Sequence, residues 1–597
     1  MCGIFGYFDR DGRPLDDDAL ARMGREIVHR GPDGDGIYHD RSSAIGLGNQ
    51  RLAILDVEHG QQPFYSDDGD IVVVQNGEIF NHVELAEELR QEGTTFTTHC
   101  DTEVILRLYE RHGIDAVSRL NGMFAIAILD RRDKALYLIR DRIGEKPLHV
   151  MLQGRRVYFG SEIKSILEVC GTTSLDYAAL NQFFTFNYVP PPRTMFEDIV
   201  HVMPGHYLKI SDQGVEDTRW WDLAGQAQEE RSEAAWIDEF QSLLHDAVRI
   251  RLRSDVPFGA FLSGGVDSSS VVGSMSQQLD YPVKTFTIGF HDPRYDESPF
   301  AAEAAERFGT EHVMRKVEPN MLDDWPLSLY HCDQPHGDVS FLPTLKVAGL
   351  AAEQVKMVLT GDGADELFAG YDKYKSFFGQ AVDGMSDEQF RDNYLDNISL
   401  FTQPSRDQLF TSTVKNKLTS LSCTSFLGKW LEQAAHMDRI NQALYIDMML
   451  LLPGNNLVKP DRMGMAVSLE NRAPFMDYRM MEFAFRMPGN LKLMNGETKY
   501  IYKKAVSPLI GEGLAYRKKQ MFTVPVGEWF KKELYPLCQD LLLSSRAVSR
   551  GLFEPAFVSH MLESHKNGEE NFTREIRSLM AMETWFRIVE ERWGIEC

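Results

Sequence analysis

The spacing of apolar residues changes character once along this chain, between residues 211 and 232. Before this stretch, apolar runs at Ile71–Gln75, Met123–Leu129 and Ala135–Ile139 predict β-strands, and helical spacing of Leu, Val and Ile predicts helices over 83–92 and 102–112. Within it, Asp, Gly, Gln and Glu predominate, as is typical of a linker. A chain of 597 residues is also too long for one hydrophobic core. We therefore predict one domain at 1–210, a linker at 211–232 and a second domain at 233–597.

The second part of the chain alternates strands, glycine turns and helices. An apolar strand at 257–262 leads into Ser263-Gly264-Gly265 and then into a helix from about Ser268. Further strands are expected at 283–288 and 356–360. Alternating β and α units of this kind predict a parallel sheet with helices on both faces. From residue 371 to residue 452 the pattern is mostly helical.

Composition argues against several classes of partner. The chain has 88 acidic and 63 basic residues, a formal net charge of −25, whereas nucleic-acid and anionic membrane surfaces require clustered positive charge. Its seven cysteines are scattered and include no CxxC pair, which indicates a reducing compartment and no structural zinc. The sequence shows neither a basic, apolar signal region nor a bilayer-length apolar run. We expect a cytoplasmic protein that binds neither nucleic acid nor membrane.

Cys2 directly follows the initiator methionine. Removal of Met1 would leave a nucleophilic thiol and a free α-amine on one residue, and an α-amine with a pKa of roughly 7.7–8.0 can act as a base near neutral pH. The flanking glycines in Cys2-Gly3-Ile4-Phe5-Gly6 are typical of a backbone that passes close to a ligand. The position therefore favours a catalytic N-terminal nucleophile over an ordinary cysteine.

A second group of motifs follows two predicted strands. Ser263–Ser269 (SGGVDSS) joins a strand to a helix, and its glycines, hydroxyls and helix dipole would form a cradle for phosphate or pyrophosphate. Thr360–Glu366 (TGDGADE) closes another strand with three carboxylates. Ligands of open α/β sheets bind where strands end, so we expect the two loops to face one crevice. Carboxylates beside a phosphate would require a bridging cation, for which Mg²⁺ is suited.

Together with Arg51-Leu52-Ala53-Ile54 and Asn76-Gly77-Glu78, these motifs resemble those of the glutamine-hydrolysing asparagine synthetases along nearly the whole chain. The resemblance implies α/β and α+β architecture: an N-terminal-nucleophile αββα sandwich, then a parallel-sheet synthetase domain of the adenine-nucleotide α-hydrolase type with a helical C-terminal region. It implies that Cys2 attacks the amide of glutamine while Asn76 and Gly77 form the oxyanion hole. The residues expected to hold the carboxylate and ammonium of glutamine are Arg51, Asn76, Gly77, Glu78 and Asp101.

In the second domain the resemblance implies a site for ATP with Mg²⁺. Its expected residues are Leu262, Ser263, Gly264, Gly265, Asp267, Ser268, Ile288, Thr360, Gly361 and Asp365, with Asp267 and Asp365 beside the metal. Lys499 would contact phosphate or the acyl-adenylate, and Asp362 would act with it, although many relatives have the longer glutamate there. Arg462 and Glu470 lie in another family-like stretch, 452–477, and receive no role.

Two departures from the family pattern stand out. Asn49 and Gln50 replace the His and Arg of many relatives, and we expect no effect on catalysis. Met521 replaces a glycine, and we expect altered packing near the cleft.

The family expectation is an enzyme that takes glutamine, ATP and aspartate and forms asparagine. The acceptor stays open, because a sugar acid or a natural-product intermediate could replace aspartate. An adenylating cyclase that does not use glutamine, a non-catalytic homologue and a stand-alone glutaminase fit less well, since each leaves Cys2, Asn76-Gly77-Glu78 or Ser263–Ser269 without a purpose. Relatives are often homodimers, so a homodimer is expected.

Overall fold

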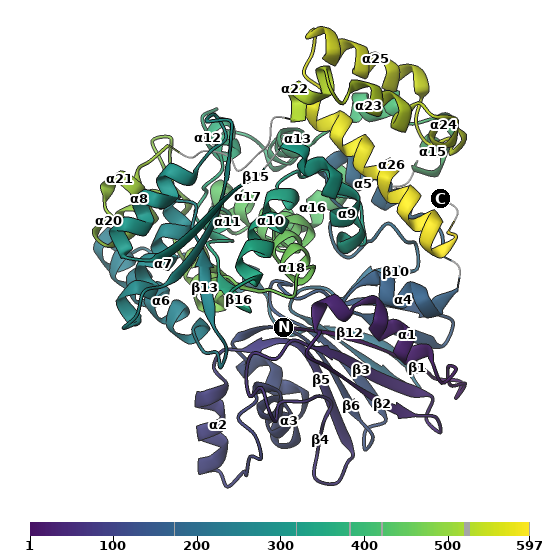
Figure 1. The fold of residues 1–597 in the computed structure, drawn as a ribbon, viewed down its shortest axis with the longest axis vertical. Coiled ribbons are helices and arrows are strands. Elements are labelled where there is room, and N and C mark those ends of the chain that lie inside the picture. Colours follow the sequence, from purple (N-terminus) through teal and green to yellow (C-terminus); the bar gives the residue numbers. More distant parts are fainter. Residues whose placement is uncertain are drawn as a thin grey trace.

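The computed structural model describes the whole chain except residues 172, 318, 381, 383, 419–421, 519–525 and 596–597. Met521, for which altered packing near the cleft was predicted, lies outside the described residues. Figure 1 shows two sheet-containing regions and, at the opposite end from the N-terminal sheets, a group of helices near the C-terminus. No helix among the described residues is both long enough and apolar enough to cross a membrane.

Two antiparallel sheets form the N-terminal domain. The strands of the first sheet, in spatial order, are β10 (Ile199–His201), β8 (His149–Gln153), β9 (Arg156–Gly160), β1 (Cys2–Asp9), β3 (Ile45–Arg51) and β2 (Gly34–Asp40). Those of the second are β12 (Gly214–Arg219), β11 (His206–Ser211), β7 (Ala135–Arg140), β6 (Gly122–Asp130), β5 (Ile71–Ile79) and β4 (Phe64–Tyr65). Residues 211–232, expected as a linker, begin with β12, so the second sheet extends to Arg219.

The two sheets pack face to face because alternate residues along their strands are apolar. Ile4 and Leu47 of the first sheet share one buried cluster with Val72 and Ala125 of the second. Helices α1 (Ala19–Glu26) and α4 (Ile163–Cys170) cover the outer face of the first sheet, and α2 (His82–Gln91) and α3 (Asp101–His112) cover that of the second. The predicted αββα sandwich is therefore confirmed, as are the strands and helices expected there.

The second domain contains a five-stranded parallel sheet, as predicted. Its spatial order is β15 (Glu311–Val317), β14 (Lys284–Phe290), β13 (Phe258–Phe261), β16 (Met357–Leu359) and β17 (Glu470–Arg472). Helices cover both faces, since Met357 and Leu359 pack in one buried cluster and Val358 between them packs in another. The order of strands reverses between β13 and β16, which is where ligands bind in such sheets.

The helices of this domain surround the sheet and extend beyond it. Those beside the sheet are α6 (Glu233–Arg251), α7 (Val266–Gln278), α8 (Ser298–Phe308), α9 (Trp325–Cys332), α10 (Phe341–Ala352), α11 (Ala364–Leu367) and α20 (Tyr500–Ile510). The stretch expected to be helical contains α12 (Asp372–Phe378), α13 (Asp387–Ile398), α14 (Gln403–Leu409), α15 (Ser412–Leu418), α16 (Cys423–Gln433) and α17 (Arg439–Ile446). After it come a π-helix (Asp447–Asn456), α18 (Val458–Met465) and α19 (Tyr478–Arg486). The helices nearest the C-terminus include α23 (Tyr535–Leu542), α25 (Pro555–Asn567) and α26 (Thr573–Trp593).

The two domains meet through buried ion pairs as well as apolar contacts. Arg30 of the first domain binds Asp461 of α18 at 2.9 Å, and Lys164 binds Asp333 at 2.7 Å, with all four side chains almost fully buried. Apolar residues of the first domain, among them Leu52 and Met123, share a cluster with the sheet of the second. Removal of one partner of a buried ion pair strongly destabilises a protein, because it leaves an uncompensated buried charge. These ion pairs therefore hold the two domains together.

Candidate active sites

Cys2 is the first residue of β1 and is buried at the edge where the two domains meet. Its N–H donates to Oδ1 of Asn76 at 3.1 Å, and its carbonyl accepts from Nε of Arg30 at 3.1 Å. The register of β1 against β3 sets Cys2 opposite Arg51. The structure therefore brings together Cys2, Arg51 and Asn76, which lie far apart in sequence and were predicted to share one site.

Burial raises the pKa of the Cys2 thiol, against the lowering effects of the N-terminal ammonium, the Leu52 main chain and the Asn49 side chain. A thiol in this environment is protonated near neutral pH and needs a base before it can attack. Nδ2 of Asn49 donates to the carbonyl of Gln75 at 3.2 Å, and the expectation that Asn49 has no effect on catalysis stays a prediction.

Met1 covers the α-amine that Cys2 would expose. The Met1 ammonium is completely buried and binds Oε2 of Glu470, on β17 of the second domain, at 2.6 Å. While Met1 is present, the nitrogen of Cys2 belongs to a peptide bond and cannot act as the base expected for the thiol. The N-terminal arrangement is complete as a catalytic pair only after Met1 is removed.

Asn76 and Gly77 lie side by side on β5. Nδ2 of Asn76 is 3.4 Å from Oγ of Ser161. Gly77 has φ +151°, and a Cβ there would lie 2.0 Å from the carbonyl oxygen of Met123. Only glycine fits this position, and both residues stand where predicted, next to Cys2.

The acidic residues expected to hold the ammonium of glutamine are buried near one another. Oε2 of Glu78 has no hydrogen-bond partner among the described residues, and Oδ2 of Asp101 accepts from the N–H of Ile79 at 2.8 Å. Burial raises the pKa of Glu78 well above its usual range, and the charges of Asp101 and Glu470 add to this effect. A buried carboxylate oxygen without a donor is costly, and a ligand ammonium would satisfy it.

Arg51 is anchored by its own neighbourhood. Its guanidinium donates to the carbonyls of Leu55, Asp56 and Val57 at 2.8–3.1 Å. A Cβ on Gly60 would lie 2.5 Å from Nη2 of Arg51, so the loop after β3 needs a glycine to close around it. The structure places Arg51 near Cys2 with its charge held in place, as binding of a carboxylate requires.

The loop after β13 forms the predicted cradle. Oγ of Ser268 accepts from the N–H of Ser263 at 3.1 Å, and the N–H of Gly265 donates to Oγ of Ser263 at 3.3 Å. Gly264 has φ +70°, and a Cβ there would lie 2.4 Å from the main chain of Phe300. Helix α7 starts at Val266 and directs its N-terminus at the same point, which favours an anion.

The loop after β16 touches the first loop, as expected for two strands at a switch point. A Cβ on Gly361 would lie 2.7 Å from Cβ of Asp267 and 2.9 Å from the nitrogen of Ser268. The N–H of Thr360 donates to the carbonyl of Arg472 at 2.9 Å. Asp362 is half-buried and makes no hydrogen bond or ion pair within the described part of the chain, so its carboxylate is available to a ligand.

Lys499 joins the two loops. Its Nζ binds Oδ1 and Oδ2 of Asp267 at 2.7 and 2.6 Å and Oδ1 of Asp365 at 2.7 Å. A Cβ on Gly370 would lie 1.9 Å from the same Asp365 oxygen and 2.2 Å from Cε of Lys499, so Gly370 is a site residue that sequence reasoning missed. Leu262 directly follows β13 and Ile288 lies on β14, and the side chains of both are buried.

The carboxylates of Asp267 and Asp365 fit the expected Mg²⁺ in one respect. Both lie within 2.7 Å of the same ammonium, one from each loop, so a cation beside them would face the phosphate cradle. Among the described residues no group of three or more His, Cys, Asp or Glu side chains could hold a metal by itself. Mg²⁺ typically binds one or two carboxylates and completes its coordination with substrate phosphates and water, which this pair allows.

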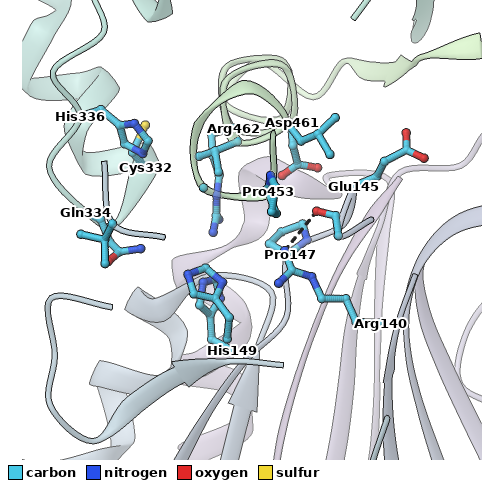
Figure 2. Close-up of a pocket in the computed structure, with 16 residues that line it drawn as sticks. Arg140, Glu145, Pro147, His149, Cys332, Gln334, His336, Pro453, Asp461 and Arg462 are labelled. Carbon is cyan, nitrogen blue, oxygen red and sulfur yellow. Dashed lines mark hydrogen bonds between the residues drawn. The ribbon is translucent and has the colours of Figure 1, made fainter. Parts of the chain in front are cut away.

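A polar cavity of about 20 Å³ lies between the domains (Figure 2). Arg140, Glu145 and His149 line it from the first domain, and Asp461 and Arg462 face them from α18. Burial lowers the pKa of His149 well below its usual range, so the imidazole is neutral, and it raises the pKa of Glu145 to about 8. The cavity lining therefore combines these two neutral groups with the charged side chains of Arg140 and Asp461.

Comparison with known proteins agrees with this arrangement. Residues 1–221 match a glutamine amidotransferase domain and residues 239–587 match asparagine synthase. The chain is 32% identical to "Asparagine synthetase (glutamine-hydrolyzing) 1" of Bacillus subtilis, over 99% of this chain and 98% of that protein. It is 27% identical to "Amidase chyE" of Penicillium rubens, over 93% of each chain.

Among solved structures, the glutamine phosphoribosylpyrophosphate amidotransferase of B. subtilis complexed with ADP and GMP is 18% identical, with a TM-score of 0.28, over 52% of this chain and 65% of that one. The family assignment rests instead on the sequence matches. Because the asparagine synthase match covers more than half of the chain and the Bacillus relative aligns along nearly its whole length, the chain belongs to the asparagine synthase family, with a glutamine amidotransferase domain followed by a synthetase domain.

Proposed function

We propose that the protein is a glutamine-dependent asparagine synthetase. The observation that supports the proposal is that one chain holds the predicted residues of both sites: Cys2 hydrogen-bonded to Asn76, and the two loops joined by Lys499. A function that used only one of the two sites would leave the residues of the other unexplained.

In the first half-reaction, Sγ of Cys2 attacks the side-chain carbonyl of glutamine after its proton passes to the α-amine. Asn76 and Gly77 stabilise the oxyanion, and one such donor is typically worth about 10²–10³ in rate. Ammonia leaves, and water hydrolyses the thioester to glutamate. The buried Oε2 of Glu78 would accept the ammonium of the substrate, which supports glutamine as the ligand.

In the second half-reaction, an acceptor carboxylate attacks the α-phosphorus of ATP and pyrophosphate leaves. The cradle at Ser263–Ser268 would bind the phosphates, and Lys499 would orient Asp267 and Asp365 towards them. Mg²⁺, when bound, would neutralise the charge of the pyrophosphate. Ammonia then attacks the acyl-adenylate and AMP leaves.

Ammonia has to arrive unprotonated, because ammonium has no lone pair. We propose that it travels inside the protein, and the buried contact of Met1 with Glu470 and with the apolar cluster of the second domain supports an enclosed route. Excess glutamate dehydrogenase, α-ketoglutarate and NADPH in the solvent should therefore capture little of it. Capture of most of the ammonia before amide forms would contradict an enclosed route.

Aspartate is the acceptor we favour, because the family and the Bacillus relative carry that activity in their names. The relatives named amidases, such as the one from P. rubens, support a second candidate in which the same two sites act on another carboxylate, such as a sugar acid or a natural-product intermediate. Pyrophosphate release with ATP and aspartate, compared with a panel of other carboxylates, separates the two. No release with aspartate would reject the first.

The two-site mechanism is tested by Cys2→Ala with either nitrogen donor. Glutamine-dependent synthesis should disappear, because the nucleophile is lost, and ammonia-dependent synthesis should continue at the wild-type rate. Loss of both activities in a folded variant would contradict the assignment of separate sites.

A further inference from the structure

Strand β17 of the synthetase domain reaches the glutamine site through Arg472. Nη2 of this fully buried arginine lies 3.6 Å from Oε1 of Glu78. Nη2 of Arg472 and Oε2 of Glu78 are both buried without a hydrogen-bond partner among the described residues. Two opposite charges, one from each domain, thus face each other where the glutamine ammonium is expected, and each keeps unused hydrogen-bonding capacity.

The rest of the Arg472 side chain is held firmly. Nε donates to Oε1 of Glu470 at 2.5 Å, and Nη1 donates to the carbonyls of Arg251 and Arg253 at 2.9 and 2.6 Å. The guanidinium therefore cannot turn away from Glu78. A planar fork fixed in this way positions a neighbouring carboxylate better than a mobile lysine would.

Several charged groups face Glu78 from the elements around it. Asp101 on α3 and Glu470 on β17 disfavour its ionised form, while Arg472 and the N-terminal ammonium favour it. His82 on α2 is buried nearby, and burial lowers its pKa, so it supplies no charge at neutral pH. Removal of Met1 would move the N-terminal ammonium back by one residue. Arg472 is then the fixed positive charge beside Glu78.

We propose that Arg472 is a positioning residue of the glutamine site, which orients the Glu78 carboxylate to bind the ammonium of glutamine and favours its ionised form. The amidotransferase site is thus completed by a residue of the synthetase domain. The proposal rests on the function proposed above, since it requires Glu78 to bind glutamine. It goes further, because nothing in the amidotransferase motifs points to a residue of β17.

The first test is the pH profile of kcat/KM for glutamine in Arg472→Gln. Without the guanidinium, Glu78 should ionise only at higher pH, and each pH unit corresponds to a tenfold change in its ionised fraction. We expect a loss of at least about tenfold at pH 7 that shrinks to about threefold at pH 9. Ammonia-dependent synthesis, compared with wild type at the same pH, should change by less than about threefold.

The matched control is Arg251→Gln. Arg251 is equally buried and packs over Phe80, as Arg472 does, but it pairs with Asp477 and not with Glu78. We expect it to lower both activities together, without moving the acid limb of the profile. Arg472→Lys should restore part of the shift, because it returns the charge without the fork.

A second variant, Glu470→Gln, predicts a change of opposite sign. It removes a negative charge near Glu78 but keeps an acceptor for Nε of Arg472, so the acid limb should move to lower pH. Equal loss of glutamine-dependent and ammonia-dependent activity in Arg472→Gln would overturn the proposal. So would acid limbs of Arg472→Gln and Glu470→Gln that do not move in opposite directions from the wild-type limb. If Arg472→Gln does not fold, an unchanged or raised limb in Glu470→Gln overturns it. A wild-type protein without glutaminase activity would reject the proposed function itself.

Discussion

Replacement of Lys499 by methionine is the most direct test of the second site. The ammonium of Lys499 is the cation between Asp267 and Asp365, and its side chain is only 4% exposed. Methionine keeps the length and the apolar stem but leaves two half-buried carboxylates, one from each loop, near each other. Removal of one partner from a buried ion pair costs about 3–5 kcal/mol. We expect a loss of stability of that size.

Lys492 provides the matched control, because it is also buried but has no carboxylate in direct contact among the described residues. Its Nζ binds Oδ1 of Asn441 at 2.7 Å, and burial lowers its pKa from 10.5 to about 7. Wild-type stability should rise relative to Lys492→Met between pH 7 and 10.5, because the unfolded chain binds the proton there and the folded chain does not. The full effect is about 5 kcal/mol at about 1.4 kcal/mol per pH unit. At pH 7 Lys492→Met should lose little stability.

The assay is urea unfolding followed by tryptophan fluorescence, with and without MgCl₂ and ATP, together with glutaminase and synthetase rates. Lys499→Met should lose synthesis with either nitrogen donor and keep its glutaminase rate within about threefold, since Cys2 belongs to another domain. Magnesium should recover part of the lost stability by taking the position between the carboxylates. The reasoning is refuted if Lys499→Met is as stable as Lys492→Met at pH 7, or if it still forms the amide.

Three further predictions concern the first domain and the interface. Burial raises the pKa of Glu145 from 4.5 to about 8, so the folded chain holds an extra proton between these pH values. Wild-type stability should therefore fall, relative to Glu145→Gln, by up to about 5 kcal/mol as the pH rises from 4.5 to 8. Urea midpoints of the two proteins that stay parallel across this range would contradict the prediction. A non-cleavable N-terminal tag should abolish glutamine-dependent but not ammonia-dependent synthesis, because Met1 is 1% exposed and its ammonium contacts Glu470; the same protein cut to begin at Cys2 is the control. Gly77→Ala should lower glutaminase by at least about 10²-fold, since its Cβ would lie 2.0 Å from a carbonyl oxygen, whereas Gly214→Ala, with open space around it, should leave the rate unchanged. Equal rates in the two variants would be inconsistent with the tight fit at Gly77.

Much of the fold could be predicted because its signals are local. The strands of the sandwich and of the parallel sheet follow apolar runs, and the loops after β13 and β16 follow glycine motifs. The least accurate boundary was the linker, since β12 is a polar edge strand whose exposed residues resemble a loop. An edge strand has one hydrogen-bonded neighbour and little buried surface, so its sequence carries a weak pattern.

Gly370 and Arg472 show what sequence reasoning could not find. Each is a common residue type in an ordinary context, and its role depends on what the fold places beside it. Lys499 was assigned from resemblance alone, and its partner Asp267 lies 232 residues away in the chain. Burial gives these contacts their strength, because a charge removed from water has to be paired, and no local pattern reports which distant partner will supply the pairing.

Short motifs in the sequence predicted both chemistries, because a nucleophile after the initiator methionine and a glycine-rich phosphate loop require particular residue types at close spacing. The tertiary structure decided how the two are joined. It buries the start of β1 against β17, so that Glu470 contacts the N-terminal ammonium and Arg472 faces Glu78. The partners of each pair lie hundreds of residues apart in the sequence. Their charges interact strongly because packing brings them together and excludes water.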